Sequence, residues 1–352
     1  MAIPTEPIGS IPRPIELING IAARAQGTIT EAELQALYDN ALRETIERME
    51  ATGAPVITDG EQTKPSFATY PIGPQFDGEG IHLPFADGHT RQLPRLVEPP
   101  FRYAARAETY LRAAKGHAGV PVKQAVIAPS ALSLFYPQDE LPGYSREAFL
   151  DDLVNEAEAD IRGCLDAGAH VVQLDFTEGR LAVKLDPSKQ LLRSFIELNN
   201  RVLDRFSDEE RRRIGIHTCP GGDLDSTHSA DVDYAELLPD LFTIHAGNVY
   251  IQLASEADPA RVLGIAARHL GADQRLFVGV IDPIDPRVET PEEVRDRTLL
   301  AAEHIPADRL GTCDDCGFSP FADDTSTSRD TAFAKIAARV AGTRLAAEQL
   351  GI

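Results

Sequence analysis

The sequence predicts an α/β fold in which eight parallel strands alternate with helices and close into a (β/α)8 TIM barrel. Three observations lead to this prediction. Eight short runs rich in apolar or β-branched residues occur along the 352 residues, and most are followed by a helical pattern. The glycine-rich first turn that usually marks a doubly wound open sheet is absent. A chain of this length also suits one large barrel.

The eight expected strands are short and are spread along the whole chain. Strands that alternate with helices form βαβ units, and their sheet is parallel. The segments lie at residues 6–11, 54–58, 122–128, 169–176, 213–218, 248–254, 275–282 and 309–313.

Four segments between these strands carry apolar residues at the i, i+3, i+4 spacing of an amphipathic helix. Each has an acidic residue, Thr or Asp in its first two positions, as helix N-termini commonly do. A fifth segment closes the chain as the final helix. The five lie at residues 30–53, 146–168, 258–271, 290–305 and 327–351.

One segment, residues 73–101, is rich in Pro, Gly and Asp and falls between the second and third expected strands. We expect it to be an excursion from the barrel, with a hairpin over the barrel mouth. The chain contains no internal repeat, low-complexity tract or clear linker. A single domain over residues 1–352 is therefore expected.

The formal net charge of −21 restricts the partners of the protein. Such an acidic surface repels nucleic acids and anionic membranes, so neither is expected as a partner. No apolar run approaches the roughly 20 residues needed to span a bilayer. The first ten residues lack the basic and apolar regions of a signal peptide. We expect a cytoplasmic protein that acts on small molecules, and the sequence leaves a homo-oligomer open.

The four cysteines are Cys164, Cys219, Cys313 and Cys316. Disulfides are rare in a reducing cytosol, where cysteines are more often buried, metal-bound or catalytic. Cys164 lies on the apolar side of an expected helix and is interpreted as a small buried hydrophobe. The other three follow expected strands and need a separate explanation.

Polar residues gather at the carboxyl ends of the expected strands, where (β/α)8 barrels place their functional groups. Side chains from separate strands are therefore expected to converge on one pocket. The residues are Gly9 and Ser10, Asp59 to Glu61, Asp175, His217 and Cys219, Asp282, and Cys313 and Cys316.

His217 and Cys219 form an H-x-C pair that leaves the fifth strand, so their side chains face the same side. Cys316 arrives from the eighth strand. One nitrogen and two sulfurs suit zinc, and three protein ligands leave a fourth position open for substrate. Alternatively, the histidine and cysteine are simply buried, and Cys313 and Cys316 form a redox pair or half of a structural zinc site.

Six segments resemble, in order and spacing, the C-terminal catalytic barrel of cobalamin-independent methionine synthase. Two segments, TEPIGSIPRP (5–14) and DGEQTKPSFATYP (59–71), are also similar to the epoxyalkane:coenzyme M transferases. The six segments are IGSIPRP (8–14), TDGEQTKPSF (58–67), VQLDFTEGR (172–180), GIHTCPGGD (215–223), VGVIDPIDPRVETPEEV (278–294) and IPADRLGTCDDCGF (305–318).

The resemblance implies a barrel of the methionine synthase and uroporphyrinogen decarboxylase type with Zn²⁺ as cofactor. It implies zinc ligands at His217, Cys219 and Cys316, and none at Cys313. Zinc lowers the pKa of a bound thiol, and the thiolate then attacks an electrophilic carbon. The residues that match the homocysteine-binding positions of methionine synthases are Ile8, Gly9, Ser10, Glu61 and Asp175.

Three departures from the methionine synthase pattern alter the expected pocket. The sixth strand lacks the glutamate that is a further zinc ligand in that family, which leaves Gln252, Glu256, His245 or the substrate alone for the fourth position. The chain has no tryptophan, and Phe135 falls near the aromatic residue that stacks on folate. The segment after Asp175 reads FTEGR, where methionine synthases have E-P-A-L.

The remaining candidates are basic and acidic residues near the expected mouth. Lys64 and Arg180, with Lys184, are expected to receive an anionic tail such as a sulfonate or a carboxylate. Asp282 and His245 are the candidate catalytic acids. His228 is a further candidate if the electrophile is an epoxide.

The sequence therefore predicts a zinc-dependent thiol alkyltransferase that takes a small thiol and an alkyl donor. The departures favour epoxide opening by a thiol such as coenzyme M. Methyl transfer to homocysteine is the alternative. A metal-free decarboxylase of the uroporphyrinogen type would leave the H-x-C pair unexplained, and a zinc-storage protein would need a closed four-ligand site.

Overall fold

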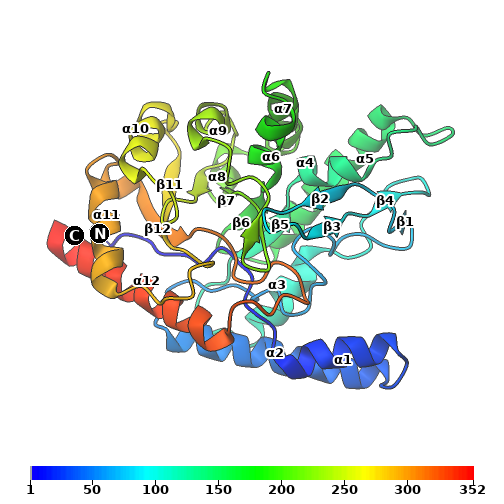
Figure 1. Cartoon of the computed structure of the whole chain (residues 1–352), viewed down its shortest axis with the longest axis horizontal. Helices are drawn as coiled ribbons and strands as arrows, with labels where there is room; N and C mark the ends of the chain where they lie inside the picture. The colour runs from blue at the N-terminus through cyan, green and yellow to red at the C-terminus, as the bar shows by residue number, and fades with distance from the viewer. Residues whose placement is uncertain (1) are drawn as a thin grey trace.

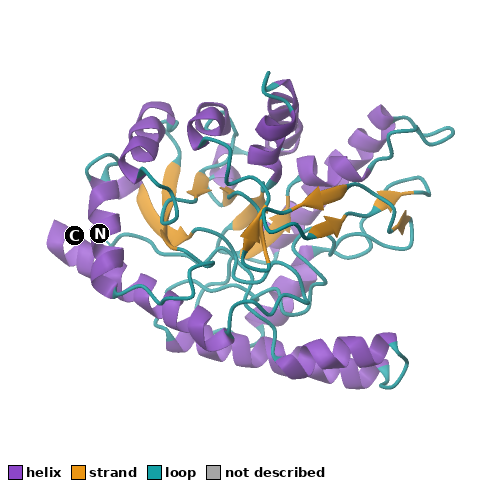
Figure 2. Cartoon of the chain, viewed as in Figure 1, coloured by secondary structure: helices purple, strands orange, loops and turns teal. Residues whose placement is uncertain are grey.

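The computed structural model describes residues 2–352. Its centre is a parallel sheet of six strands in the order β12-β11-β10-β7-β6-β5, surrounded by helices (Figures 1 and 2). All six coincide with segments expected to be strands. They are β5 (Gln124–Ile127), β6 (Val172–Asp175), β7 (Ile214–Thr218), β10 (Asn248–Ile251), β11 (Arg275–Ile281) and β12 (Leu310–Asp314).

The first two expected strands are not regular strands, although they complete the barrel. Each pairs with the sheet through a single parallel bridge, Thr5 with Thr312 on β12 and Ile57 with Val122 before β5. They also meet each other, because the Ile11 amide donates to the Gly60 carbonyl at 3.0 Å. Prolines at positions 4, 7 and 12 have no N–H to donate, which prevents a continuous ladder in the first segment. The TIM-barrel-like fold is thus confirmed with six regular strands.

All five expected helices are present, and their observed ends lie within three residues of the expected ones. Side-chain caps explain several of the starts, because Thr30 and Thr290 each form a capping box with the glutamate three residues later. The five are α2 (Glu31–Ala51), α5 (Arg146–Asp166), α10 (Pro259–His269), α11 (Pro291–Ala302) and α12 (Arg329–Leu350).

Further helices, which the sequence analysis does not identify, fill the other connections. The helix α1 packs on α2 as an antiparallel extension below the barrel in Figure 1. The helices not identified from the sequence are α1 (Ile15–Ala25), α3 (Ala107–Lys115), α4 (Pro129–Leu132), α6 (Glu178–Leu185), α7 (Gln190–Leu203), α8 (Asp208–Arg211) and α9 (Tyr234–Leu241). Two 3-10 turns lie at Ser133–Phe135 and Ala307–Arg309.

The excursion consists of two nested antiparallel pairs. β1 (Phe76–Asp77) pairs with β4 (Arg95–Leu96), and β2 (His82–Pro84) pairs with β3 (Thr90–Gln92). The tip of this hairpin is tied to the small pair β8 (Gly222–Asp223) and β9 (Ser226–Thr227), which follows β7. The Ala86 amide donates to the Thr227 carbonyl at 2.9 Å, and Arg91 pairs with Asp223. The hairpin therefore lies against the loop that leaves the H-x-C strand.

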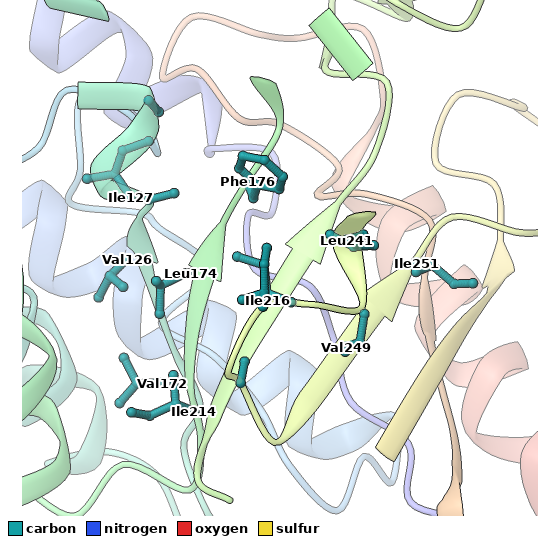
Figure 3. Close-up of a cluster of buried hydrophobic side chains, with 14 of the residues drawn as sticks. Val126, Ile127, Val172, Leu174, Phe176, Ile214, Ile216, Leu241, Val249 and Ile251 are labelled. Atoms are coloured by element: carbon teal, nitrogen blue, oxygen red, sulfur yellow. The ribbon is translucent and has the colours of Figure 1, made fainter. Parts of the chain in front are cut away.

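Alternating residues of the strands face the helices and form the main core. Val172 and Leu174, and likewise Ile214 and Ile216, are fully buried between sheet and helices (Figure 3). Residues of the other parity, including His217, face the barrel interior. Strand alternation thus separates an apolar outer layer from an interior that carries the polar groups.

None of the helices within residues 2–352 combines the length and the apolar character needed to cross a membrane.

Candidate metal and substrate site

Three potential metal ligands converge at the carboxyl ends of β7 and β12. The ligand atoms of His217, Cys219 and Cys316 all lie within 4.8 Å of one another. The two sulfurs are 3.0 Å apart. His217 and Cys219 are buried, and Cys316 is partly buried. One nitrogen and two sulfurs at this spacing match the donor set of a three-ligand zinc site.

The surroundings of the Cys316 thiol are consistent with a cation site. Its hydrogen bond with Cys219 and its own burial together raise the pKa of the Cys316 thiol well above its ordinary value. Two buried thiolates side by side repel each other unless a cation lies between them. The arrangement therefore suits zinc, which binds cysteine as thiolate.

His217 is held in place through both ring nitrogens. Its Nδ1 lies 3.2 Å from Asp175 Oδ1, and its Nε2 lies 3.3 Å from the carbonyl oxygen of Asp315. Burial disfavours the charged imidazole, but the carboxylate of Asp175 outweighs this effect and raises the pKa of His217. A carboxylate on a ligand histidine fixes the ring orientation and increases its basicity as a ligand.

The expected homocysteine-binding residues lie in the same cavity as the metal ligands. Ile8, Gly9, Ser10, Glu61 and Asp175 all line a cavity whose walls also include His217 and Cys316. The cavity holds about 860 Å³ of empty space, including solvent at its open mouth, which is the size of a small-molecule site. The geometry thus brings these residues together, and their contact with a substrate stays a prediction.

The backbone at Glu61 is strained. Its φ angle is 55°, and it follows Gly60, whose φ is 63°. The Glu61 amide donates to Asp59 at 3.0 Å, and Arg13 donates to the Glu61 carbonyl at 2.7 Å. A non-glycine residue persists in this region only when its surroundings hold it there, and such positions cluster at functional sites. Glu61, which lines the cavity, is therefore held in a fixed backbone conformation.

Lys64 does not line the cavity, contrary to the expectation that it binds an anionic tail. Its side chain is fully buried behind Glu61, with Nζ 3.1 Å from Oε1 of Glu61 and 2.9 Å from the Ala125 carbonyl oxygen. Burial opposes its charge, but Glu61 and Asp59 together raise the pKa of Lys64 above its usual range. Lys64 neutralises and positions Glu61.

Arg180 is likewise not a cavity residue. It is buried, forms an ion pair with Glu256 and lies over the ring of Tyr234 at 4.0 Å. Lys184 donates to the His228 carbonyl oxygen and to Asp231. In each case a carboxylate of the chain itself holds the cation, so none of the three is directed at a substrate.

The structure does not bring His245, an expected catalytic acid, to the cavity that holds the metal ligands. It precedes β10 by three residues, whereas His217 lies at the end of β7, which runs parallel to β10. His245 therefore lies at the amino end of the sheet, opposite to the site, where its Nδ1 pairs with Asp204 at 2.6 Å.

Asp282 lies closer, in a second pocket that shares Cys316 with the first. Its carboxylate accepts from the Ile284 amide at 3.0 Å. Its catalytic role stays a prediction. In the same pocket, Gln252 donates to Glu256 at 2.9 Å, and Glu256 is not among the clustered ligand atoms. The choice between Gln252, Glu256 and the substrate as fourth ligand stays open.

The rest of the cavity wall is mainly apolar, and much of it was not identified from the sequence. The hairpin contributes Leu83, Phe85 and Leu93, which are remote in sequence from the metal ligands, and the loop after β12 contributes Phe321. Phe135, which we expected at the folate position, is part of this wall. The apolar residues include Phe67, Leu83, Phe85, Leu93, Leu134, Phe135, Leu181 and Phe321.

Three further polar side chains line the cavity, Thr177, Glu178 and His228. Burial lowers the pKa of His228 to about 4, so its imidazole is neutral near pH 7. Its ring packs edge-on against Phe85 and leaves no room for a Cβ at Gly221. Glu178 was not identified from the sequence, although an acidic residue three positions after the strand-end Asp175 was a usable signal.

Comparisons with known proteins identify the family of this chain. The family model described as the catalytic domain of the cobalamin-independent synthases matches residues 3–338. A methionine synthase from Sulfurisphaera tokodaii is 22% identical over 352 residues, which cover 99% of this chain and 94% of that protein. A 5-methyltetrahydropteroyltriglutamate–homocysteine methyltransferase from Nitratidesulfovibrio vulgaris is 26% identical over 325 residues. That match covers 90% of this chain and 38% of the relative.

Solved structures share the fold. A B12-independent methionine synthase from Shewanella sp. W3-18-1, in complex with selenomethionine, superimposes with a TM-score of 0.76 at 20% identity, covering 99% of both chains. A putative vitamin-B12-independent methionine synthase from Listeria monocytogenes gives a TM-score of 0.72 at 19% identity, covering 97% of this chain and 98% of that chain.

Proposed function

This chain belongs to the family of the catalytic domain of cobalamin-independent methionine synthase, and on that premise we propose that it is a zinc-dependent methyltransferase whose acceptor is homocysteine. The observation that carries the proposal is the convergence of His217, Cys219 and Cys316 beside Glu61 and Asp175 in one cavity. We further propose that residues 1–352 act as a single catalytic domain.

His217, Cys219 and Cys316 would hold the zinc. When bound there, zinc lowers the pKa of a coordinated thiol so that the nucleophilic thiolate exists at neutral pH. Asp175 orients the His217 ring, and the apolar wall of the cavity excludes water from the sulfur.

The charges in the cavity favour an amino acid as the acceptor. Glu61 and Asp175 both line the cavity, and Lys64 balances only one of these carboxylates. The α-ammonium group of homocysteine would balance the other, and a buried charge needs such a partner. Ile8 to Ser10 would face the same end of the substrate, as the resemblance implies.

Coenzyme M, the acceptor that the sequence favours, fits the cavity less well. Its only permanent charge is a sulfonate, which requires a cation from the protein, and none of the described residues that line the cavity is lysine or arginine. The carboxylate of homocysteine is instead accompanied by the ammonium group of the same molecule. A uroporphyrinogen, which carries several carboxylates, meets the same objection. The similarity to epoxyalkane:coenzyme M transferases therefore stays a prediction, and homocysteine is the better-supported thiol.

The first experiment measures metal and ligand binding. We expect about one zinc per chain after mild purification, and loss of most of it in Cys219→Ser. Cys313→Ala is the matched control, because Cys313 is buried but lies outside the ligand cluster. Homocysteine should add a sulfur ligand at the zinc X-ray absorption edge. Less than about half a zinc per chain, or equal zinc in the wild type and Cys219→Ser, would contradict the proposal.

The second experiment measures the reaction itself. Methyl iodide and homocysteine are incubated with the enzyme, and methionine is quantified by mass spectrometry. We expect methionine formation above the uncatalysed rate that is lost in Cys219→Ser and retained in Cys313→Ala. Alkylation of coenzyme M in preference to homocysteine would exclude the proposed acceptor.

A further inference from the structure

Glu178 is a buried carboxyl group that the proposed thiol chemistry does not use. It is the first residue of α6 and follows β6 by three positions, and only 3% of its surface is exposed. It lines the same cavity as His217 and Cys316. Besides Asp175 and Thr177, which precede it, the cavity wall around Glu178 includes the apolar residues Leu134, Phe135 and Leu181.

The two carboxyl oxygens of Glu178 have different surroundings. Oε1 accepts a hydrogen bond from the Ser130 hydroxyl, which in turn accepts one from Nδ2 of Asn199 at 2.9 Å. Oε2 is buried and has no hydrogen-bond partner among the described residues. A buried polar atom without a partner is costly, and its persistence calls for an explanation such as a ligand.

The surroundings also favour the neutral form of this group. Burial, with a smaller contribution from the nearby charge of Asp175, raises the pKa of Glu178 to about 8. The other titratable groups on the cavity wall are Glu61, His217, His228 and Cys316, and Arg180 on the same helix is occupied by Glu256. Because Ser130 donates to Oε1, the proton of the neutral acid belongs on Oε2.

We propose that Glu178 is the general acid that protonates the leaving atom of the alkyl donor, and that the donor class is a molecule whose reacting end is uncharged and has a nitrogen or oxygen leaving atom. The proposal rests on the function proposed above. The apolar wall beside Glu178 suits the uncharged reacting end of a donor, and a nitrogen or oxygen atom there would give Oε2 the partner that it lacks.

The reaction balances with one proton. The thiolate sulfur forms a bond to the alkyl carbon, and the bond from carbon to the leaving atom breaks with its electron pair on that atom. Glu178 gives its proton to the leaving atom and becomes a carboxylate. Binding of the next thiol releases one proton, which restores the acid, so the net reaction is thiol plus alkyl donor to thioether plus protonated leaving group.

The test compares donors that differ in their need for an acid. Iodide leaves from methyl iodide without a proton, whereas the oxygen of 1,2-epoxypropane and the nitrogen of 5-methyltetrahydropteroyltriglutamate require one. With homocysteine as acceptor, Glu178→Gln should lower kcat at least about 100-fold for the two acid-requiring donors and less than about threefold for methyl iodide. Glu197→Gln, an exposed change on α7, is the matched control.

Wild-type pH profiles supply a measurement that does not depend on the folding of a variant. For the acid-requiring donors, kcat should fall as the pH rises above about 8, because Glu178 loses its proton. Methyl iodide should lack this alkaline limb, and Glu178→Gln should lack it with every donor.

The outcomes separate this inference from the proposed function. If methyl iodide alkylates homocysteine but Glu178→Gln slows every donor equally, Glu178 is structural and the inference fails alone. The same holds if neither acid-requiring donor reacts with the wild type, or if methyl iodide shows the same alkaline limb. If wild-type enzyme with bound zinc does not accelerate methylation by methyl iodide, the proposed function itself fails.

Discussion

Replacement of Lys64 by methionine tests whether this ammonium group holds Glu61 in the cavity. The substitution removes an ion pair of 3.1 Å and a hydrogen bond of 2.9 Å to the Ala125 carbonyl oxygen. Both side chains of the pair are essentially inaccessible to solvent. Loss of one partner of a buried pair costs about 3–5 kcal/mol, because the other charge remains buried and alone.

The expected size of the effect follows from the chain length. The unfolding entropy is about 2.1 cal/mol/K per residue, or about 0.7 kcal/mol/K for 352 residues. A loss of about 3–5 kcal/mol therefore lowers Tm by about 4–7 °C. Differential scanning calorimetry at pH 7 measures this shift, and KM for homocysteine should rise in the same variant because Glu61 is no longer fixed.

The pH dependence of the effect has a definite sign. Burial already raises the pKa of Glu61, and removal of Lys64 raises it further. Below the unfolded-state pKa of about 4.3, Glu61 is protonated in both states, so its contribution to the variant's loss of stability is small there. The loss of stability grows as the pH rises from the folded-state pKa of Glu61 in the wild type to its higher folded-state pKa in the variant. Lys64→Met/Glu61→Gln should recover stability and lose this dependence. An unchanged Tm at pH 7, or a deficit that does not vary with pH, would refute the reasoning.

Two further predictions concern Gly221 and His245. Gly221→Ala places a Cβ 1.7 Å from the His228 ring at a φ of 70°, so we expect a loss of about 1–3 kcal/mol in thermal unfolding and a higher KM. Gly222→Ala, which meets only a carbonyl oxygen at 3.9 Å, is the control, and an equal loss in both variants would contradict the prediction. His245→Ala should leave kcat and KM within about twofold, because the lost ion pair with Asp204 is half-exposed and such pairs contribute little. A large drop in kcat would restore His245 as a catalytic candidate.

The local sequence pattern predicts most of the strands and helices, because apolar runs and amphipathic spacing are recognisable within short segments of the chain. The capped helices α2 and α11 begin within one residue of the expected positions. Where prolines interrupt the pattern, as in residues 4–12, an apolar run still lies at the correct place in the barrel but cannot form a ladder. The helices α6 and α7 were not identified, although the chain there is helical and amphipathic.

The sequence predicts those residues of the candidate site whose position depends only on the direction of the strand that carries them. His217 and Cys219 follow one strand at alternate positions, so their convergence with Cys316 required only that the strands be parallel. The same reasoning should have excluded His245, because the expected strand begins after it. The roles of Lys64 and Arg180 depend on which carboxylate each reaches, and Arg180 reaches Glu256, 76 residues away. Pairing at that sequence distance follows from the barrel and not from any local pattern.

The buried cations share one structural role, and this explains the chemistry of the cavity. In a chain with net charge −21, the inaccessible side chains of Lys64, Lys123, Lys335 and Arg339 each pair with a buried carboxylate. These cations hold acidic side chains and loops in place, and none is left to face a substrate in the cavity. The cavity therefore presents Glu61, Asp175 and Glu178 against an apolar wall. On the function and the acid proposed above, such a surface would favour a thiol with an ammonium group over one whose only permanent charge is a sulfonate, and would leave the Glu178 carboxyl group for the donor.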